Sequence, residues 1–146
     1  MKVVINTDES INDMEVVINC KQLTPEIEKI IQMLRMMDKK LTGIANGETY
    51  IIEIEQILYI ESVDKKTFIY TKERIYESSF KLYELEQQLE THSFFRANKS
   101  CIINFRCIES LKADINRRII VTLINGEKLI VSRQYAEQLK ERLGVK

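Results

Sequence analysis

The sequence is poor in the residues on which most enzymes and metal sites depend. Its 146 residues include one histidine, three cysteines, no tryptophan, one proline and four glycines. His92 stands in a polar stretch without the partners of a catalytic triad. Cys20, Cys101 and Cys107 lack the paired spacing of a tetrahedral zinc site. An odd number of cysteines without an export signal favours reduced thiols, and we expect all three to be buried.

Phosphate-binding and acid–base motifs are also missing. No glycine-rich phosphate loop occurs, because turns and a helix end account for the four glycines. Glu53 and Glu55 alternate with isoleucines, which is typical of the solvated face of a strand rather than of paired catalytic carboxylates. The sequence therefore argues against an enzyme, and it implies no cofactor and no metal.

The chain lacks any long apolar run. No segment approaches the roughly 18 uncharged apolar residues of a membrane span, and the first ten residues turn polar where a secretory signal would be apolar. Hydrophobic residues make up 45% of the chain and charged residues 30%, which is typical of a globular protein. We expect a cytoplasmic protein with one compact domain, a short extension and no membrane contact.

A net charge of zero hides an uneven distribution. Residues 1–95 carry 11 basic and 17 acidic side chains, whereas residues 96–146 carry 11 basic and 5 acidic ones. A cationic half provides the local positive potential that contact with a polyanion requires. Ordinary surface variation is the alternative interpretation.

The first 40 residues predict a strand-and-helix extension. Lys2–Asn6 and Glu15–Cys20 are rich in β-branched residues and predict strands. Thr24, followed by a proline and an acidic residue, is typical of a helix start. Apolar residues recur at helical spacing as far as Met37, which indicates an amphipathic helix. Its apolar face fits either packing on the same chain or contact with a partner.

A change of pattern at Asp38–Leu41 marks the expected boundary between an extension over residues 1–40 and a domain over residues 41–146. Asn46-Gly47 and Asn125-Gly126 each separate two strand-like runs, which is the pattern of a β-hairpin. The strands expected in the domain are 41–45, 49–54, 57–62, 67–70, 75–78, 101–104, 108–111, 119–124 and 128–131.

Two helices are expected within the same domain. Residues 80–90 have leucines at helical spacing, and residues 134–143 form a last helix that ends at Gly144. The predicted fold class is therefore mainly β: an antiparallel multi-sheet domain with an inserted helix, preceded by the strand-and-helix extension.

Three polar clusters interrupt the apolar strands, at residues 64–67, 96–100 and 132–135. Each combines a cation with hydroxyl or amide side chains, the groups that hold phosphate oxygens and, for arginine, can read guanine in the major groove. Each cluster alone also fits an ordinary solvated loop. A nucleic-acid interface requires the three clusters to converge in space.

The segments ILYIESVDKKTFIYT, FKLYELEQQLETHSFFRANKSCIINFRCIESL and NGEKLIVSRQYAEQLKERLG occur in this order. Their order and motifs resemble the LytTR family of bacterial DNA-binding domains over about residues 41–146. The central motif begins at Phe95-Arg96 and ends at Asn104, and the second motif is Val131-Ser132-Arg133-x-Tyr135. The resemblance implies a mostly antiparallel fold of three small sheets that binds promoter DNA through loops in successive major grooves.

The resemblance also implies roles for individual residues. Arg133 occupies the position of the family's base-reading arginine. Lys99, with Asn98 and Ser100 beside it, stands where the family contacts DNA from its middle loop. These residues are the first candidates for direct contact.

The same resemblance gives other positions a role in DNA contact or in the structure of the loops. Lys66 and Thr67 stand in the first contact loop, and phosphate contact is expected there because the histidine of some relatives is absent. Arg96 and Asn104 match the central motif and either contact DNA or fix the loop through hydrogen bonds. The full expected DNA-binding set is Lys65, Lys66, Thr67, Arg96, Asn98, Lys99, Ser100, Asn104, Ser132, Arg133, Gln134 and Tyr135.

Forty residues are too few for the receiver domain that many members of the family carry, so the sequence resembles a stand-alone LytTR regulator. We expect a sequence-specific transcriptional regulator that reads double-stranded promoter DNA in the major groove. A homodimer would suit repeated half-sites. The alternative is a β domain that binds no DNA and captures a protein partner through its N-terminal helix.

Overall fold

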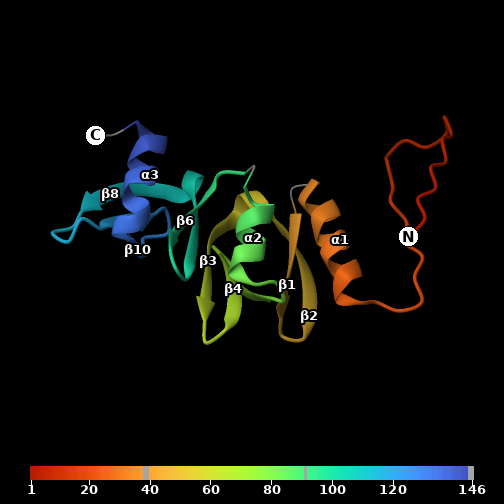
Figure 1. Ribbon diagram of the computed structural model, residues 1–146, viewed down its shortest axis with the longest axis horizontal. Helices are drawn as coiled ribbons and strands as arrows, with labels where there is room; N and C mark the ends of the chain where they lie inside the picture. The colour runs from red at the N-terminus through yellow and green to blue at the C-terminus, as the bar shows by residue number, and fades with distance from the viewer. Residues whose placement is uncertain (38–39, 91, 145–146) are drawn as a thin grey trace.

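The computed structural model describes residues 1–37, 40–90 and 92–144. Over these residues the chain forms ten strands in two sheets, together with three α-helices (Figure 1). The elements are α1 (Pro25–Met37), β1 (Lys40–Ala45), β2 (Glu48–Glu53), β3 (Ile57–Val63), β4 (Lys66–Thr71), β5 (Ile75–Ser78), α2 (Leu82–Gln88), β6 (Phe94–Asn98), β7 (Cys101–Asn104), β8 (Ile108–Ala113), β9 (Ile119–Leu123), β10 (Lys128–Val131) and α3 (Arg133–Leu143).

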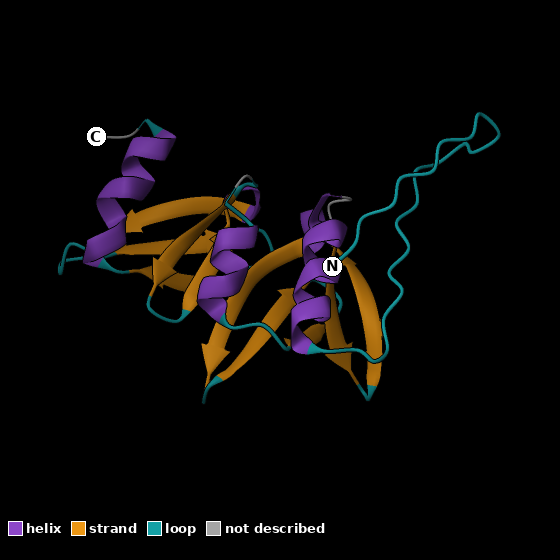
Figure 2. Ribbon diagram, turned by 45° about the vertical axis from the view of Figure 1, so that its right-hand side comes forward, coloured by secondary structure: helices purple, strands orange, loops and turns teal. Residues whose placement is uncertain are grey.

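Both sheets are antiparallel throughout the described residues. The larger sheet has the order β2-β1-β5-β4-β3-β7-β6, and the smaller has the order β10-β9-β8. The expectation of three small sheets is wrong, because the pair Ile44 and Glu77 joins the first hairpin to β5. Figure 2 shows the two sheets side by side, with the helices against them.

Each strand expected after residue 40 is present, with ends shifted by at most two residues. The turn after β1 has Asn46 and Gly47 at positive φ, 52° and 76°, as a tight hairpin turn requires. The sequence did not predict β6. A register shift between Arg96 and Asn98 interrupts its pairing with β7, so the usual alternation of buried and exposed residues is lost.

The amphipathic helix α1 is confirmed. Thr24 Oγ1 accepts a hydrogen bond from the Ile27 backbone N–H at 3.3 Å, as a helix cap does. The helix packs on the large sheet, where Thr42 donates to Gln32 Oε1 at 3.2 Å. The expected domain boundary at 38–41 falls partly on residues 38–39, which lie outside the described residues.

The strands expected at Lys2–Asn6 and Glu15–Cys20 are wrong for the single chain, because both segments are extended but unpaired. An isolated pair of strands has no third strand and no apolar face to pack on, so the chain alone does not stabilise it. The expectation for Cys20 is also wrong, since it is exposed, whereas Cys101 and Cys107 are buried as predicted.

Two apolar clusters form the core. Beneath α2, its Leu85 packs with sheet residues that include Ile60 and Ile69. Beneath α3, its Leu139 packs with residues of both sheets that include Val121. The second cluster anchors the small sheet and the start of α3 to the end of the large sheet.

Gly144 and Gly43 are required for different reasons, the first for its backbone conformation and the second for close packing. Gly144 ends α3 in the left-handed conformation, with φ of 68°, as predicted. Gly43 lies inside β1 rather than in a turn, and a Cβ atom there would lie 2.5 Å from Cβ of Tyr76.

No helix in the described ranges has the length and apolarity needed to cross a membrane.

Candidate nucleic-acid interface

The side chain of Arg96 fixes the shape of the turn between β6 and β7. Its guanidinium donates to the backbone oxygen of Asn98 at 2.7 Å and to the backbone oxygen of Lys99. The same group pairs with Glu86 of α2 at 2.8 Å, and its side chain is 16% exposed. The hydrogen bonds of Arg96 therefore stabilise the turn within the protein. Lys99, at the tip of the turn, is exposed.

Asn98 joins this turn to the last strand. Its Oδ1 accepts from the backbone N–H of Ser100 at 2.9 Å, and its Nδ2 donates to the backbone oxygen of Ile130 at 2.8 Å. Nearby, the backbone N–H of Ser132 donates to the backbone oxygen of Ala97 at 2.9 Å. These bonds bring the second and third polar clusters together.

Strand β3, which leads into the first polar cluster, is bonded to the same turn. The backbone N–H of Ser62 donates to the backbone oxygen of Ser100 at 2.8 Å. In the β3–β4 turn, Asp64 and Lys65 have positive φ values of 50° and 68°, so the hairpin is tight and Lys65 lies at its exposed tip. Figure 1 shows the β3–β4 and β6–β7 turns at the same side of the molecule.

Not every residue of the first cluster faces solvent. Lys66 is exposed, and its Nζ lies 4.0 Å from a carboxylate oxygen of Glu77, a separation at which exposed ion pairs contribute little. Thr67 is 5% exposed within β4. The structure thus places the two lysines outward and the threonine inward.

The third cluster forms the start of α3. The Ser132 backbone oxygen accepts from the N–H groups of Tyr135 and Ala136 at 3.0 and 2.9 Å. Arg133 and Gln134 are exposed, whereas Tyr135 packs against the core. The Arg133 guanidinium makes no hydrogen bond or ion pair with the described residues. Its donors are therefore available to a ligand.

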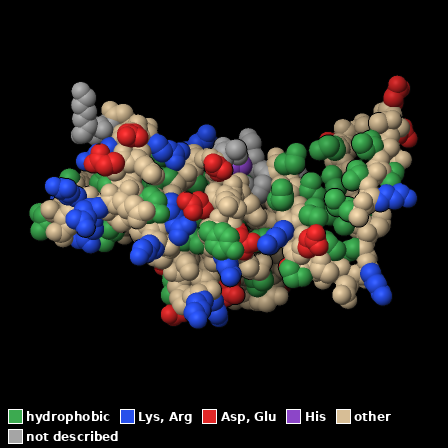
Figure 3. Space-filling model, viewed as in Figure 1, with side chains coloured by type: hydrophobic (Ala, Val, Ile, Leu, Met, Phe, Trp, Pro, Cys, Tyr) green, Lys and Arg blue, Asp and Glu red, His purple; other side chains and the backbone are tan. Residues whose placement is uncertain are grey.

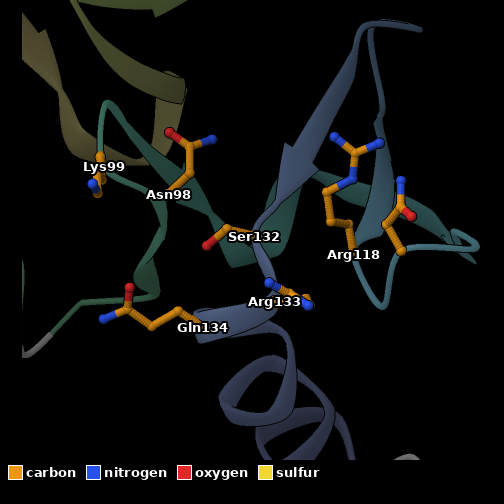
Figure 4. A pocket seen from close by; sticks show the side chains of 7 residues that line it. Asn98, Lys99, Arg118, Ser132, Arg133 and Gln134 are labelled. Carbon is orange, nitrogen blue, oxygen red and sulfur yellow. The ribbon is translucent and has the colours of Figure 1, made fainter.

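The second and third clusters border a common hollow of about 710 Å³. Figure 4 shows Lys99 and Asn98 on one side, Ser132, Arg133 and Gln134 at the start of α3, and Arg118 on the β8–β9 hairpin. Its lining consists of Asn98, Lys99, Asn116, Arg118, Ser132, Arg133 and Gln134. The hollow is polar and cationic, with no acidic side chain in its lining.

Sequence reasoning missed two of the lining residues, Asn116 and Arg118. Arg118 donates to Asp114 Oδ2 from Nε at 2.9 Å and from a terminal nitrogen at 2.7 Å. These bonds hold the pKa of Asp114 below its usual value. Arg118 is one of the basic residues that give the chain after residue 95 its positive charge. That charge count cannot show that the β8–β9 hairpin, which carries Arg118, folds beside α3.

Comparison with known proteins gives a family. The LytTr DNA-binding domain family matches residues 47–144. The chain belongs to this family. A solved LytTr DNA-binding domain from Bacillus cereus superposes with a TM-score of 0.69 at 27% identity, covering 73% of this chain and 97% of that one. The mostly antiparallel LytTr fold predicted from the sequence is confirmed.

Curated relatives resemble the LytTr chain over nearly its whole length. An uncharacterized HTH-type transcriptional regulator of Staphylococcus aureus strain bovine RF122 / ET3-1 is 31% identical over 97% of this chain and 95% of its own. A second, from strain NCTC 8325 / PS 47, is 29% identical over the same shares. In the described part of this LytTr chain, strands separate each helix from the next, so no helix-turn-helix pair is formed there.

Asn104 lies at the far end of β7 from the LytTr hollow. It is 1% exposed, donates to the Ile57 backbone oxygen at 2.8 Å and accepts from the Arg106 N–H at 3.1 Å and Ser93 Oγ at 3.2 Å. The geometry thus favours loop fixation for Asn104 and Arg96, the second of the two roles that the sequence left open.

Proposed function

We propose that this DNA-binding regulator reads double-stranded promoter DNA specifically, in the major groove, through the β3–β4 turn, the β6–β7 turn and the start of α3. One observation carries the proposal: hydrogen bonds join the β6–β7 turn to the end of β3 and to the start of α3, which brings distant parts of the chain into one cationic surface. Figure 3 shows basic side chains over the half of the molecule that carries these turns. Such a surface suits phosphate and base contacts together.

Arg133 is the base-reading residue of the proposal. Its planar guanidinium is exposed at the edge of the hollow and has the two parallel donors that fit O6 and N7 of guanine. Gln134 beside it has an amide that can pair with adenine in the same groove. Both side chains extend from the first turn of α3, whose later residues Ala136 and Leu139 are buried against the core.

Lysines and hydroxyl groups provide the phosphate contacts. Lys65 and Lys66 reach one stretch of backbone from the β3–β4 turn, and Lys99 reaches another from the β6–β7 turn. Ser100 and Ser132, which provide hydroxyl groups, lie beside Lys99. Asn98 and Arg96 hold the β6–β7 turn in place, and Asn104 fixes the far end of β7. Thr67 is buried within β4 and Tyr135 packs against the core, so none of these five residues binds DNA in the proposal.

The proposal extends to the whole protein. Residues 41–146 form the DNA-binding unit, and residues 1–40 serve as an extension with a separate task. The regulator acts in the cytoplasm as a homodimer on repeated half-sites spaced by whole helical turns. Two linked binding units gain affinity over one, because the second contact becomes intramolecular.

Selection from random DNA tests the proposal directly. The full-length protein is incubated with a pool of random-sequence duplexes at moderate salt, and the bound fraction is amplified and sequenced over several rounds. We expect a short enriched motif, repeated at intervals of about one helical turn. A pool that stays random, with no retention even at low salt, would contradict the proposed function.

Substitutions then separate base reading from phosphate contact. Arg133→Ala should weaken binding to the enriched duplex by about 1–3 kcal/mol and relax the preference at one base pair. Lys99→Ala should weaken binding to all duplexes and lower the slope of log affinity against log salt by about one unit. Fluorescence anisotropy over a salt series measures both.

Arg106→Ala is the matched control for Arg133→Ala. Arg106 is also exposed, but it follows the far end of β7 from the turn. It should leave affinity and sequence preference unchanged. If Arg133→Ala behaves like this control, the base-reading role is wrong.

A further inference from the structure

The first 24 residues, here called the arm, expose an unusual amount of apolar surface. Figure 3 shows hydrophobic side chains gathered over the arm and the neighbouring helix, at the end of the molecule where the N-terminus lies. A soluble monomer rarely leaves so many large apolar side chains in water side by side. After Met1 (110%), the most exposed in the arm are Val3 (76%), Val4 (64%), Ile5 (82%), Met14 (83%), Val17 (71%) and Leu23 (62%).

The arm is also ready for strand pairing. The tetrapeptide VVIN occurs twice, at residues 3–6 and 16–19, and both copies are extended. Figures 1 and 2 show the two limbs running side by side from a turn at residues 8–11. β-branched runs without proline whose backbone groups are unpaired are templates for pairing with another chain.

Helix α1 continues this surface. Met33 and Met37 are 61% and 75% exposed on its outer side. Among the side chains of α1 that the structure describes, the buried one is polar: Gln32 is 2% exposed, and its Nε2 atom has no partner among the described residues. The helix therefore covers the sheet with only part of its apolar surface and leaves the rest to solvent.

We propose that the arm and the outer side of α1 form the interface with a second copy of this chain. The surface is nearly neutral, since the arm carries two basic and four acidic side chains. Two identical copies therefore meet without strong electrostatic repulsion. A two-fold axis places the same patch on both sides of an interface, and antiparallel pairing of identical VVIN runs satisfies that symmetry.

The position of the surface also fits a second copy. The arm and α3 lie at opposite ends of the long axis of the molecule (Figure 1). A dimer through the arms leaves both cationic surfaces open and separates them, as binding to two half-sites requires. This step of the argument rests on the proposed function, whereas the exposed apolar surface stands without it.

Sedimentation of the full chain tests the interface. We expect a dimer at micromolar concentration, and Val4→Lys with Val17→Lys should weaken dimerisation by at least about tenfold, because the lysines would be buried without a partner. Both positions are exposed in the single chain, so the fold tolerates the change. The matched control is Ile124→Lys, at a 61% exposed position outside the arm, which should leave the dimer intact.

Native thiol chemistry gives a second readout. Cys20 is exposed next to the second VVIN run, whereas the other two cysteines are buried. A short bismaleimide should therefore link Cys20 of two copies, and Cys20→Ser should abolish the product. The arm double variant should also lose it. A wild-type chain that stays monomeric, or a dimer that survives the arm substitutions, would overturn the proposal.

Binding to DNA separates this proposal from the proposed function. On a duplex with one copy of the selected motif, the arm double variant should bind like the wild type. On a duplex with two copies, the wild type should bind more tightly by on the order of 100-fold, and the variant should lose that gain. If the wild type binds no duplex, the regulator proposal fails, while sedimentation still decides the interface.

Discussion

At the residue scale, two arginines of one interface have opposite environments. Arg96 is largely buried and donates to two backbone oxygens and a carboxylate, whereas Arg133 is exposed and its guanidinium makes no hydrogen bond or ion pair with the described residues. The side-chain chemistry is the same in both. Only the packing around each guanidinium decides whether its donors shape the protein or meet a ligand.

Asn104 shows the same principle for an amide. Asn104→Ala should lower the free energy of unfolding by about 1–3 kcal/mol, because the buried Ile57 oxygen would lose its amide donor and keep the weaker Cys107 thiol at 3.7 Å. Urea denaturation measures the change. Asn116→Ala, at an exposed position, serves as the control and should stay within about 0.5 kcal/mol of the wild type. An unchanged stability of the Asn104 variant would contradict a structural role.

At the element scale, the β6–β7 turn depends on Arg96 for its shape. Arg96→Ala should weaken DNA binding by about 1–2 kcal/mol, since ordering the free turn on binding then costs conformational entropy. Its salt slope should match that of the wild type, because the guanidinium makes no phosphate contact. Arg96→Lys should not restore binding, since an ammonium cannot form the same bidentate contacts.

A salt series on the same duplex distinguishes the alternatives. A slope lowered by about one unit in Arg96→Ala, as expected for Lys99→Ala, would show that Arg96 contacts a phosphate directly. Recovery by Arg96→Lys would point to the same conclusion.

The elements themselves were largely readable from the sequence. Helix α1 and the hairpins at Asn46-Gly47 and Asn125-Gly126 were predicted because caps, helical periodicity and turn residues act over a few neighbouring positions. β6 was not predicted, because its register shift depends on pairing with β7. The strands expected in the arm were wrong because strand formation needs a partner strand as well as a suitable sequence.

At the scale of the whole molecule, a buried thiol and a buried phenol make the stability of the fold depend on pH in the alkaline range. Burial raises the pKa of Cys101 from 9.0 to about 12, and burial also raises the pKa of Tyr59. The unfolded chain releases these protons at lower pH than the folded chain does. The contribution of these two groups to stability should therefore be constant below about pH 9 and fall between about pH 9 and pH 12.

Urea denaturation over that pH range measures the effect. Each group should contribute at most about 1.4 kcal/mol per pH unit. Cys101→Val, which removes one of these protons, should flatten the decline relative to the wild type. An equal decline in both proteins would mean that Cys101 is not coupled to unfolding.

The sequence by itself determined the strands after residue 40 except β6, the three helices, the three polar clusters and the cationic second half. These features follow from local spacing and composition. The tertiary structure alone decided that the second and third clusters border one hollow, that Arg118 and Asn116 join them, that Thr67 and Asn104 point inward, and that the arm remains unpaired. The physical reason is that burial and hydrogen-bond pairing depend on partners far away in the chain, which no local pattern specifies.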